Sequence, residues 1–249
     1  MTYAVSQWRP GAYDSDNFMY DGFKFYASSE YAYSLSSPDN NTMRFEVRKG
    51  DRLDLPGWTD EIGSERSEMT QSSPRYTINS EAGKHFSIEY KFMVEPGAKN
   101  TAKWLVMGQL HSGMNKAGPF NVAFRNDDKM QLLAMHDNGE TVLFKDTQDI
   151  VRGKWYTMKI DLQFGPSGDG HIAAWRDGAK IADYHGKVGY SDQVNTWWNM
   201  GIYRNSPPGG ETTAIQFKDI DLTYGADGHS DTAHTLSPNS TDRCPHVEN

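Results

Sequence analysis

Cysteine and long apolar runs are both scarce in this 249-residue chain. Cys244 is the only cysteine, so neither an intrachain disulfide nor a cysteine-based zinc cluster can form. No apolar run is long enough to span a bilayer. Residues 1–18 also lack the continuous apolar core of a secretion signal. We therefore expect no membrane partner and no signal peptide in this chain.

Positive charge is in deficit as well. The chain carries 25 Lys and Arg against 33 Asp and Glu, for a formal net charge of -8 at pH 7. Nucleic acids and anionic membranes are bound through basic surfaces, so a nucleic-acid partner is not expected. An anionic polymer could still bind in a local basic groove. Aromatic residues are plentiful, with 7 Trp and 13 Tyr, and their flat rings suit a sandwich core or stacking on sugars.

Helical spacing of apolar residues is rare, and strand-like alternation occupies most of the chain. The pattern predicts an all-β fold, a jelly-roll sandwich of two antiparallel sheets with a concave groove. We expect a single domain over residues 1–249, with a core at about 42–224 and a polar tail at 225–249. Residues before Thr42 show no regular period. The predicted strands are 42–48, 65–70, 85–92, 103–110, 120–125, 130–136, 141–144, 155–162, 171–176, 180–184, 199–203 and 213–223.

Three of these strands carry polar residues two or four positions apart. Alternate residues of a strand point to the same face, so each pair can project together. Side by side on a curved sheet, they would place a guanidinium, an amide, an imidazole and a phenol around one groove. The pairs are Arg66 with Glu68, Gln109 with His111, and Asn199 with Tyr203.

These groups match the needs of β-elimination in a uronic-acid polysaccharide. That reaction removes the C5 proton and breaks the C4–O bond, and C5 beside an ionised carboxylate is a very weak acid. A catalyst must neutralise the carboxylate and stabilise the charge that develops on it, which calls for Arg, Gln or Asn. It must also supply a base and an acid, roles open to His and Tyr.

The same segments resemble the three signature strands of the jelly-roll polysaccharide lyases, the group that holds alginate lyases, glucuronan lyases and heparin lyase I. They are residues 65–69 (ERSEM), 108–111 (GQLH) and 198–204 (WNMGIYR). Residues 44–51 resemble the heparin-lyase-like branch most. Order and spacing match over about 42–223. The resemblance implies a concanavalin-like sandwich and a lyase that needs no cofactor for catalysis.

The resemblance also implies roles for single residues. Arg66 and Gln109 would bind the substrate carboxylate, and His111 would act as the base or neutralise the carboxylate. Tyr203 would protonate the leaving O4, and Glu68 would hold Arg66 in place.

Two positions depart from the alginate-lyase pattern. Those enzymes usually have Lys where this chain has Asn199, and their third motif ends in Asn-Gln where this one has Arg204-Asn205. We interpret Asn199 and Arg204 as substrate-binding residues, and we expect a glucuronate-rich polymer rather than alginate.

Further substrate contacts are predicted from strand faces. Arg44 and Arg48 share a face and could form a basic strip beside the groove, although a merely solvated face is an equal alternative. Asn121 and Arg125 lie on a polar face where subsites could form. Of two adjacent tryptophans at most one can line the groove, and Trp198 is the candidate.

No metal is expected in the active site, because the histidines show no spacing typical of a metal centre. Asp219 and Asp221 could bind a structural calcium ion on the convex side. His136, Tyr184 and His185 have no motif context, and we interpret them as structural. We expect a monomer that acts outside the cell.

Two other functions share this architecture. A glycoside hydrolase needs two carboxylates at a set separation, but residues 60–65 (DEIGSE) have the wrong phase for the sandwich hydrolases and contain a glycine. A non-catalytic carbohydrate-binding, lectin-like module is the stronger alternative. Such a module has no need of a His and a Tyr placed together with Arg and Gln.

Overall fold

The computed structural model describes residues 18–20, 23–28, 31–39, 41–55, 58–73, 85–112, 116–192 and 196–225. Within these ranges the chain forms strands, turns and loops, and no helix is present. The described part therefore holds no helix that could cross a membrane.

Two antiparallel sheets make up most of the described fold, and a small hairpin accompanies them. The eight-stranded sheet has the order β1 (Phe18–Tyr20), β2 (Phe23–Ser28), β7 (Ser64–Ser73), β16 (Thr196–Asn205), β9 (Leu105–Ser112), β10 (Phe120–Phe124), β11 (Gln131–His136), β12 (Gly139–Lys145). The seven-stranded sheet has the order β15 (Ala179–Val188), β14 (Gly165–Arg176), β13 (Tyr156–Gln163), β8 (His85–Val94), β17 (Thr213–Gly225), β4 (Thr42–Val47), β3 (Leu35–Asp39). The hairpin pairs β5 (Asp54–Leu55) with β6 (Trp58–Thr59).

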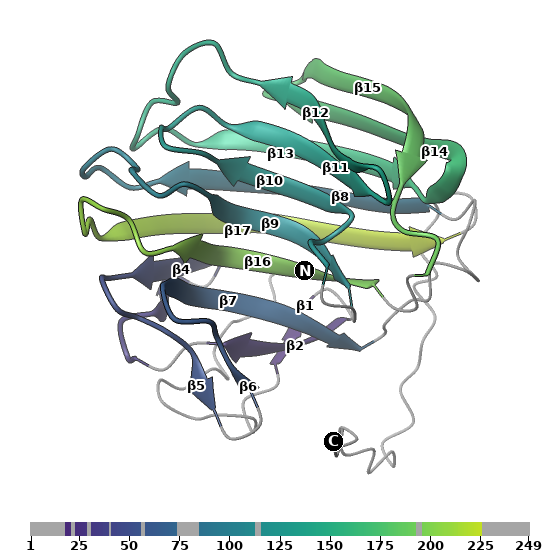
Figure 1. Ribbon diagram of the computed structural model, residues 1–249. Coiled ribbons are helices and arrows are strands. Elements are labelled where there is room, and N and C mark those ends of the chain that lie inside the picture. The colour runs from purple at the N-terminus through teal and green to yellow at the C-terminus, as the bar shows by residue number, and fades with distance from the viewer. Residues whose placement is uncertain are drawn as a thin grey trace.

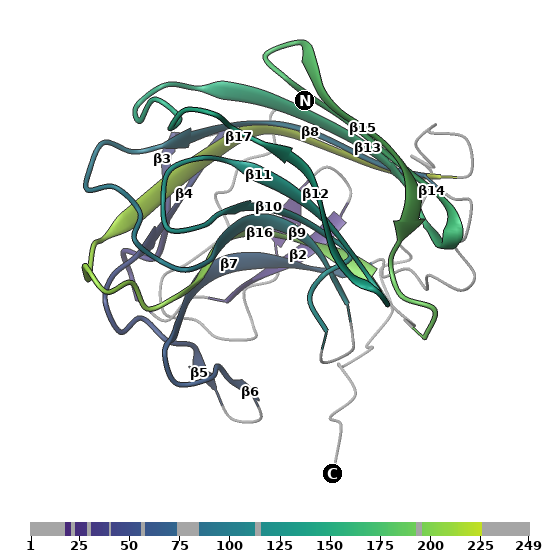
Figure 2. The same cartoon turned by 45° about the horizontal axis from the view of Figure 1, so that its top comes forward.

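The sheets are stacked and curved together (Figure 1). Figure 2 shows the seven-stranded sheet arching over the eight-stranded one, so the outward face of the eight-stranded sheet lies on the inside of the curve. We call this outward face the site face. The hairpin β5–β6 projects from the rim beside β7 (Figure 1).

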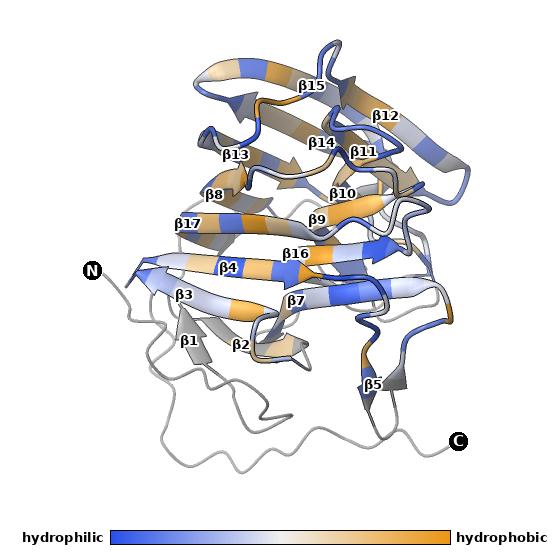
Figure 3. Ribbon diagram, turned by 90° about the vertical axis from the view of Figure 1, so that its left-hand side faces the viewer, coloured by the Kyte–Doolittle hydropathy of each residue, from blue (hydrophilic) through white to orange (hydrophobic). Residues whose placement is uncertain are grey.

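The core fills the space between the sheets. On β8, every second side chain from Phe86 to Phe92 is fully buried, as the period of a strand requires. The ring of Trp198 on β16 lies opposite, with centroids 5.4 Å from Phe86 and 6.5 Å from Tyr90. The same alternation appears as bands of hydropathy along β4 and β17 in Figure 3. Burial of these large side chains supplies the main stabilisation of the fold.

The predicted two-sheet jelly roll is confirmed, and each of the twelve predicted strands coincides with an observed one. Strands β1, β2 and β3 lie before Thr42, where the sequence shows no regular period. β1 and β3 are edge strands that pair on one side only, and short edge strands carry a weak periodic signal. The predicted polar tail lies outside the described residues except for Gly225.

Two glycines let the central strands of the eight-stranded sheet approach closely. A Cβ at Gly108 would lie 2.9 Å from the Trp198 ring. Gly201 has φ of 142°, and a Cβ there would lie 2.4 Å from the carbonyl oxygen of Ser67. Only glycine adopts such a conformation at no steric cost. The pairing of β16 with β9 shifts register beside Gly201, between Met200 and Tyr203.

Candidate active site

The site face carries a row of four polar side chains on four adjacent strands. The register pairs Thr70 with Asn199, Asn199 with Gln109, and Gln109 with Asn121. All four side chains are almost completely buried. They therefore form a polar floor across the middle of the sheet.

Two titratable side chains flank this floor. Tyr203 lies on one side of the floor, where it is paired with Arg66 of β7. His111 lies on the other side, where it is paired with Trp197 of β16. Tyr203 and His111 are only partly buried, so they are the accessible members of the set. The guanidinium, the amide of Gln109, the imidazole and the phenol thus project from the same face of one sheet.

Glu68 links β7 to β9 across the intervening strand β16. Gln109 Nε2 donates to Glu68 Oε1 over 3.1 Å, although strands two places apart are separated by about 10 Å. The residue opposite Glu68 on β16 is Gly201, which has no side chain to obstruct the link. Burial raises the pKa of Glu68, while Arg66 and Gln109 donate to its carboxylate and oppose the rise.

Arg66 is held between two carboxylates and an aromatic ring. Its Nε lies 2.9 Å from Asp60 Oδ2 and its Nη2 lies 2.8 Å from Asp60 Oδ1. Its Nη1 donates to Glu68 Oε2 over 2.5 Å. The guanidinium carbon lies 3.7 Å from the centroid of the Tyr203 ring, which is cation–π geometry. The prediction that Glu68 holds Arg66 agrees with these contacts.

Asp60 is a site residue that the sequence did not reveal. It follows the hairpin β5–β6 rather than lying on a strand of either large sheet, so strand periodicity gives no signal for it. Its side chain is buried, with 2% exposure, and the backbone N–H of Asp60 donates to Leu53 O over 2.9 Å. Asp60 ties the hairpin to Arg66.

The environment of Tyr203 keeps its phenol protonated. Burial raises the pKa of Tyr203 above its ordinary value of 10.0, and the nearby Asp60 and Glu68 carboxylates raise it further. Arg66 and a hydrogen bond with Ser64 act in the opposite direction but do not cancel the rise. The Trp104 ring packs against the phenol, with centroids 4.8 Å apart. Tyr203 is therefore suited to donate a proton at neutral pH.

His111 is oriented by Trp197. The two rings stack with centroids 5.0 Å apart and an interplanar angle of 25°. Trp197 is only 6% exposed, so it supports the imidazole rather than offering a platform for sugar. Of the two adjacent tryptophans, Trp197 is the one on the site face.

The amides of the floor differ in their hydrogen bonding. Asn121 Nδ2 donates to the carbonyl oxygen of Gly118 over 3.0 Å, which leaves this side chain fixed beside Gln109. The Oδ1 atom of Asn199 is buried and has no hydrogen-bond partner among the described residues. A buried amide oxygen without a partner is costly. A hydroxyl group of a bound sugar would satisfy it.

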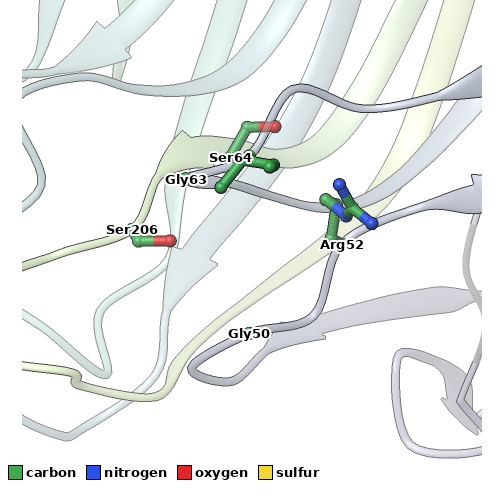
Figure 4. Close-up of a pocket in the computed structure, with 6 residues that line it drawn as sticks. Gly50, Arg52, Gly63, Ser64 and Ser206 are labelled. Carbon is green, nitrogen blue, oxygen red and sulfur yellow. The ribbon is translucent and has the colours of Figure 1, made fainter.

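A cavity of about 300 Å³ adjoins the Tyr203 side of the site. Ser64 lies two residues before Arg66 on β7 and lines this cavity together with Arg52 and Ser206 (Figure 4). Among the described residues, the guanidinium of Arg52 makes only long hydrogen bonds, 3.3 Å to Asp54 and 3.4 Å to the carbonyl oxygen of Asp60. The cavity thus places a weakly engaged cation near Ser64, whose side chain hydrogen-bonds with Tyr203.

The structure corrects four predicted substrate contacts. Arg44 and Arg48 lie on β4 and just after it, on the outward face of the seven-stranded sheet, because Met43, Phe45 and Val47 take the inward positions. Arg44 binds Glu95 over 2.7 Å and Arg48 binds Glu46 over 2.6 Å. The prediction that these two arginines form a basic strip beside the groove is therefore wrong.

The prediction that Trp198 and Arg204 contact the substrate is wrong for a different reason, because both side chains point into the space between the sheets. Each has 0% exposure. Trp198 packs in the aromatic core, and Arg204 binds Glu65 Oε2 over 2.8 Å. Neither side chain can contact a substrate on the site face.

Arg125 and the calcium candidates are engaged elsewhere. Arg125 makes two hydrogen bonds to Glu140 at the β10–β12 side of the sheet. Asp219 accepts hydrogen bonds from Lys91, over 2.8 Å, and from Asn41, over 2.5 Å. Calcium binding at Asp219 and Asp221 stays a prediction.

Comparisons with known proteins identify the family to which this chain belongs. A family model described as polysaccharide lyase matches residues 10–221. No curated protein matches the sequence significantly. Among solved structures, alginate lyase AlgAT5 from polysaccharide lyase family 7 is 15% identical with a TM-score of 0.56, covering 80% of this chain and 85% of that one.

Two further structures show the same fold. The endo-β-1,4-glucuronan lyase from the fungus Trichoderma reesei is 11% identical with a TM-score of 0.56, covering 86% of this chain and 92% of that one. Alginate lyase PA1167 from Pseudomonas aeruginosa is 16% identical with a TM-score of 0.51, covering 77% and 86%. Because the family model spans most of the sequence, from before β1 into β17, this chain belongs to the polysaccharide lyase family and is a polysaccharide lyase enzyme.

Proposed function

We propose that the enzyme cleaves a uronic-acid polysaccharide, with glucuronate-rich polymers favoured, by β-elimination. The observation that carries this proposal is the polar floor of Gln109 and Asn199, flanked by Tyr203 and His111 on one face of one sheet. The departure from alginate-lyase pattern at Asn199 supports the preference for glucuronate. Because such polymers lie outside cells, we propose an extracellular site of action.

The proposed reaction needs one base, one acid and a stabilised carboxylate. The base takes the C5 proton, the electrons of the C5–H bond form a C4=C5 double bond, the C4–O bond breaks, and the leaving oxygen receives a proton. The amides of Gln109 and Asn199 donate to the uronate carboxylate, where negative charge develops in the transition state. The protonated phenol of Tyr203 supplies the proton to O4.

The identity of the base depends on the sugar. In glucuronate the C5 proton and O4 lie on the same side, so Tyr203 can serve both steps with His111 assisting. In guluronate or iduronate they lie on opposite sides, and His111 must be the base. The raised pKa of Tyr203 favours its acid role, whereas the base role on glucuronate requires the phenolate, which this raised pKa makes scarce at neutral pH.

The charge of Arg66 is neutralised by Asp60 and Glu68, which fix its orientation over the Tyr203 ring. We therefore propose that Arg66 positions the phenol. The same contacts argue against hydrolysis. A glycosidase needs one protonated and one ionised carboxyl group flanking the bond, whereas both carboxylates here bind one guanidinium.

The direct test is the product. Mixing the purified enzyme with glucuronan, alginate and heparin separately should produce ultraviolet absorbance from the C4=C5 double bond, strongest with glucuronan. Reducing ends without that absorbance would show hydrolysis, and tight binding without either signal would show a carbohydrate-binding module. Elimination of alginate alone would overturn the glucuronate preference but not the mechanism. Size-exclusion chromatography of the same sample checks the predicted monomer.

Arg52 offers a test of how the polymer extends beyond the reacting sugar. A uronate neighbouring the cleaved residue on the Tyr203 side could place its carboxylate in the cavity beside Arg52. Arg52→Ala is expected to raise KM several-fold and leave kcat nearly unchanged, because the contact is the same in ground and transition states. Steady-state kinetics on the preferred polymer measure this.

Arg48→Ala is the matched control, since it removes an exposed arginine from the opposite sheet. Arg48→Ala should leave KM unchanged. An equal rise in both variants would reveal a general charge effect and contradict the Arg52 contact.

A further inference from the structure

A second cluster of ligand-type side chains lies far from the site face. His171 on β14 is directly paired with His185 on β15, and Asp183 lies two residues before His185 on the same face. The buried neighbours Ile172 and Ala182 point inward, so the three side chains project outward from the seven-stranded sheet. β15 is the edge strand of that sheet.

The three side chains converge on a small volume. His171 Nε2 lies 2.8 Å and His185 Nε2 lies 3.8 Å from the same atom, Asp183 Oδ1. The two imidazole rings stack with centroids 4.2 Å apart. One ligand atom from each residue falls within 4.8 Å of the others. Ligand atoms at Zn–N distances of about 2.0–2.1 Å in a tetrahedral site are about 3.3 Å apart, so small side-chain rotations suffice.

The donor set selects a class of metal. Two imidazole nitrogens and one carboxylate oxygen suit Zn²⁺, Cu²⁺ or Ni²⁺, whereas Ca²⁺ and Mg²⁺ prefer all-oxygen sites. Three protein ligands leave the fourth tetrahedral position for water. Among the described residues, this is the one group of three such side chains close enough to share an ion.

Lys180 forms an ion pair with one member of the cluster, Asp183. Its Nζ lies 2.6 Å from Asp183 Oδ2, so it engages the oxygen that faces away from the histidines. Hydrogen bonds from His171 and Lys180 lower the pKa of Asp183 to about 2, which keeps this carboxylate ionised near neutral pH. The ammonium group orients Asp183 but also repels a cation nearby.

We propose that His171, Asp183 and His185 bind a divalent transition metal ion, with Zn²⁺ preferred, on the outward face of the seven-stranded sheet. The ion links the edge strand β15 to β14. Because it binds the folded chain, it stabilises the fold and takes no part in cleavage on the opposite sheet.

The test is titration of metal-free, full-length enzyme with ZnCl₂ by isothermal calorimetry. Wild type should bind, and thermal unfolding at about 100 times the Kd should show a Tm raised by roughly 5 to 10 °C. His171→Ala/His185→Ala should weaken binding at least about 10-fold and abolish most of the Tm rise. CoCl₂ in place of zinc should give visible absorption bands of a tetrahedral site in wild type only.

Two further variants test whether zinc binding is specific to this cluster and sensitive to the neighbouring charge. His136→Ala removes a histidine outside the cluster, one that contacts Thr141, and should leave zinc binding unchanged. Lys180→Met should strengthen binding by removing a neighbouring positive charge. Equal zinc affinity in wild type and His171→Ala/His185→Ala, two chains that share every other histidine, would overturn the proposal. So would the absence of heat on adding zinc to wild type.

Discussion

Tyr203→Phe is expected to lower kcat by about 10²–10⁴-fold, the usual contribution of a general acid or base. The substitution removes the proton donor for O4 but keeps the ring on which Arg66 rests, so the fold and the KM should change little. Burial raises the pKa of the phenol, so wild type should keep its acid form through neutral pH. On a substrate for which Tyr203 is the acid alone, the alkaline limb of kcat against pH should therefore lie above the ordinary phenol pKa of about 10 and disappear in the variant.

Tyr184→Phe is the matched control. Its hydroxyl donates to the carbonyl oxygen of Lys187 over 3.3 Å on the other sheet, so its loss should leave kcat unchanged. Product absorbance on the preferred polymer measures both variants. A Tyr203→Phe enzyme that retains more than a tenth of the wild-type rate would contradict the acid role.

Arg204→Met is expected to cost about 3–5 kcal/mol of unfolding free energy, the typical cost of leaving one member of a buried ion pair without its partner. Arg204 and Glu65 both have 0% exposed side chains. Arg204 also donates to Thr213 Oγ1 over 2.8 Å and to the carbonyl oxygen of Glu211 over 2.8 Å. The residue therefore ties β16 in one sheet to the start of β17 in the other.

Urea unfolding of three variants separates the charge effect from packing. Arg204→Met leaves the Glu65 carboxylate buried without a cation, with the Gly50 N–H still donating to it, whereas Arg204→Met/Glu65→Leu removes both charges and should recover part of the loss. Lys99→Met, which breaks an exposed pair with Asp149, should cost at most about 1 kcal/mol. If Arg204→Met costs no more than Lys99→Met, the buried pair is not a structural tie.

Strand periodicity predicted most strands of the sandwich, and it predicted on which face of a strand most candidate site residues lie. Alternation alone places Arg66, Gln109, His111 and Tyr203 outward, because Met69, Leu110 and Ile202, at inward-facing positions of the same three strands, are apolar and buried. Arg204 shows the limit of this approach. Strand parity places it inward, beside Glu65, but its charge and its place in the third motif suggested a substrate contact.

Irregularities in the sheets could not be predicted. The Asp177-Gly178 turn alone would pair His171 with Tyr184, but a register shift between Ala174 and Trp175 pairs it with His185 instead. A slip of one residue moves a side chain to the other face. The sequence interpretation of His185 as merely structural therefore missed the cluster, and Asp60 was missed because it lies outside the regular strands.

The ion pair between Asp60 and Arg66 links the activity of the enzyme to the stability of a small hairpin. Asp60 reaches the sheet from a hairpin of two very short strands that is separate from both large sheets. Small elements with few buried apolar contacts open locally at lower free energy than the whole domain. Mild denaturant should therefore break the ion pair between Asp60 and Arg66 and inactivate the enzyme while both sheets remain intact, so that inactivation precedes global unfolding.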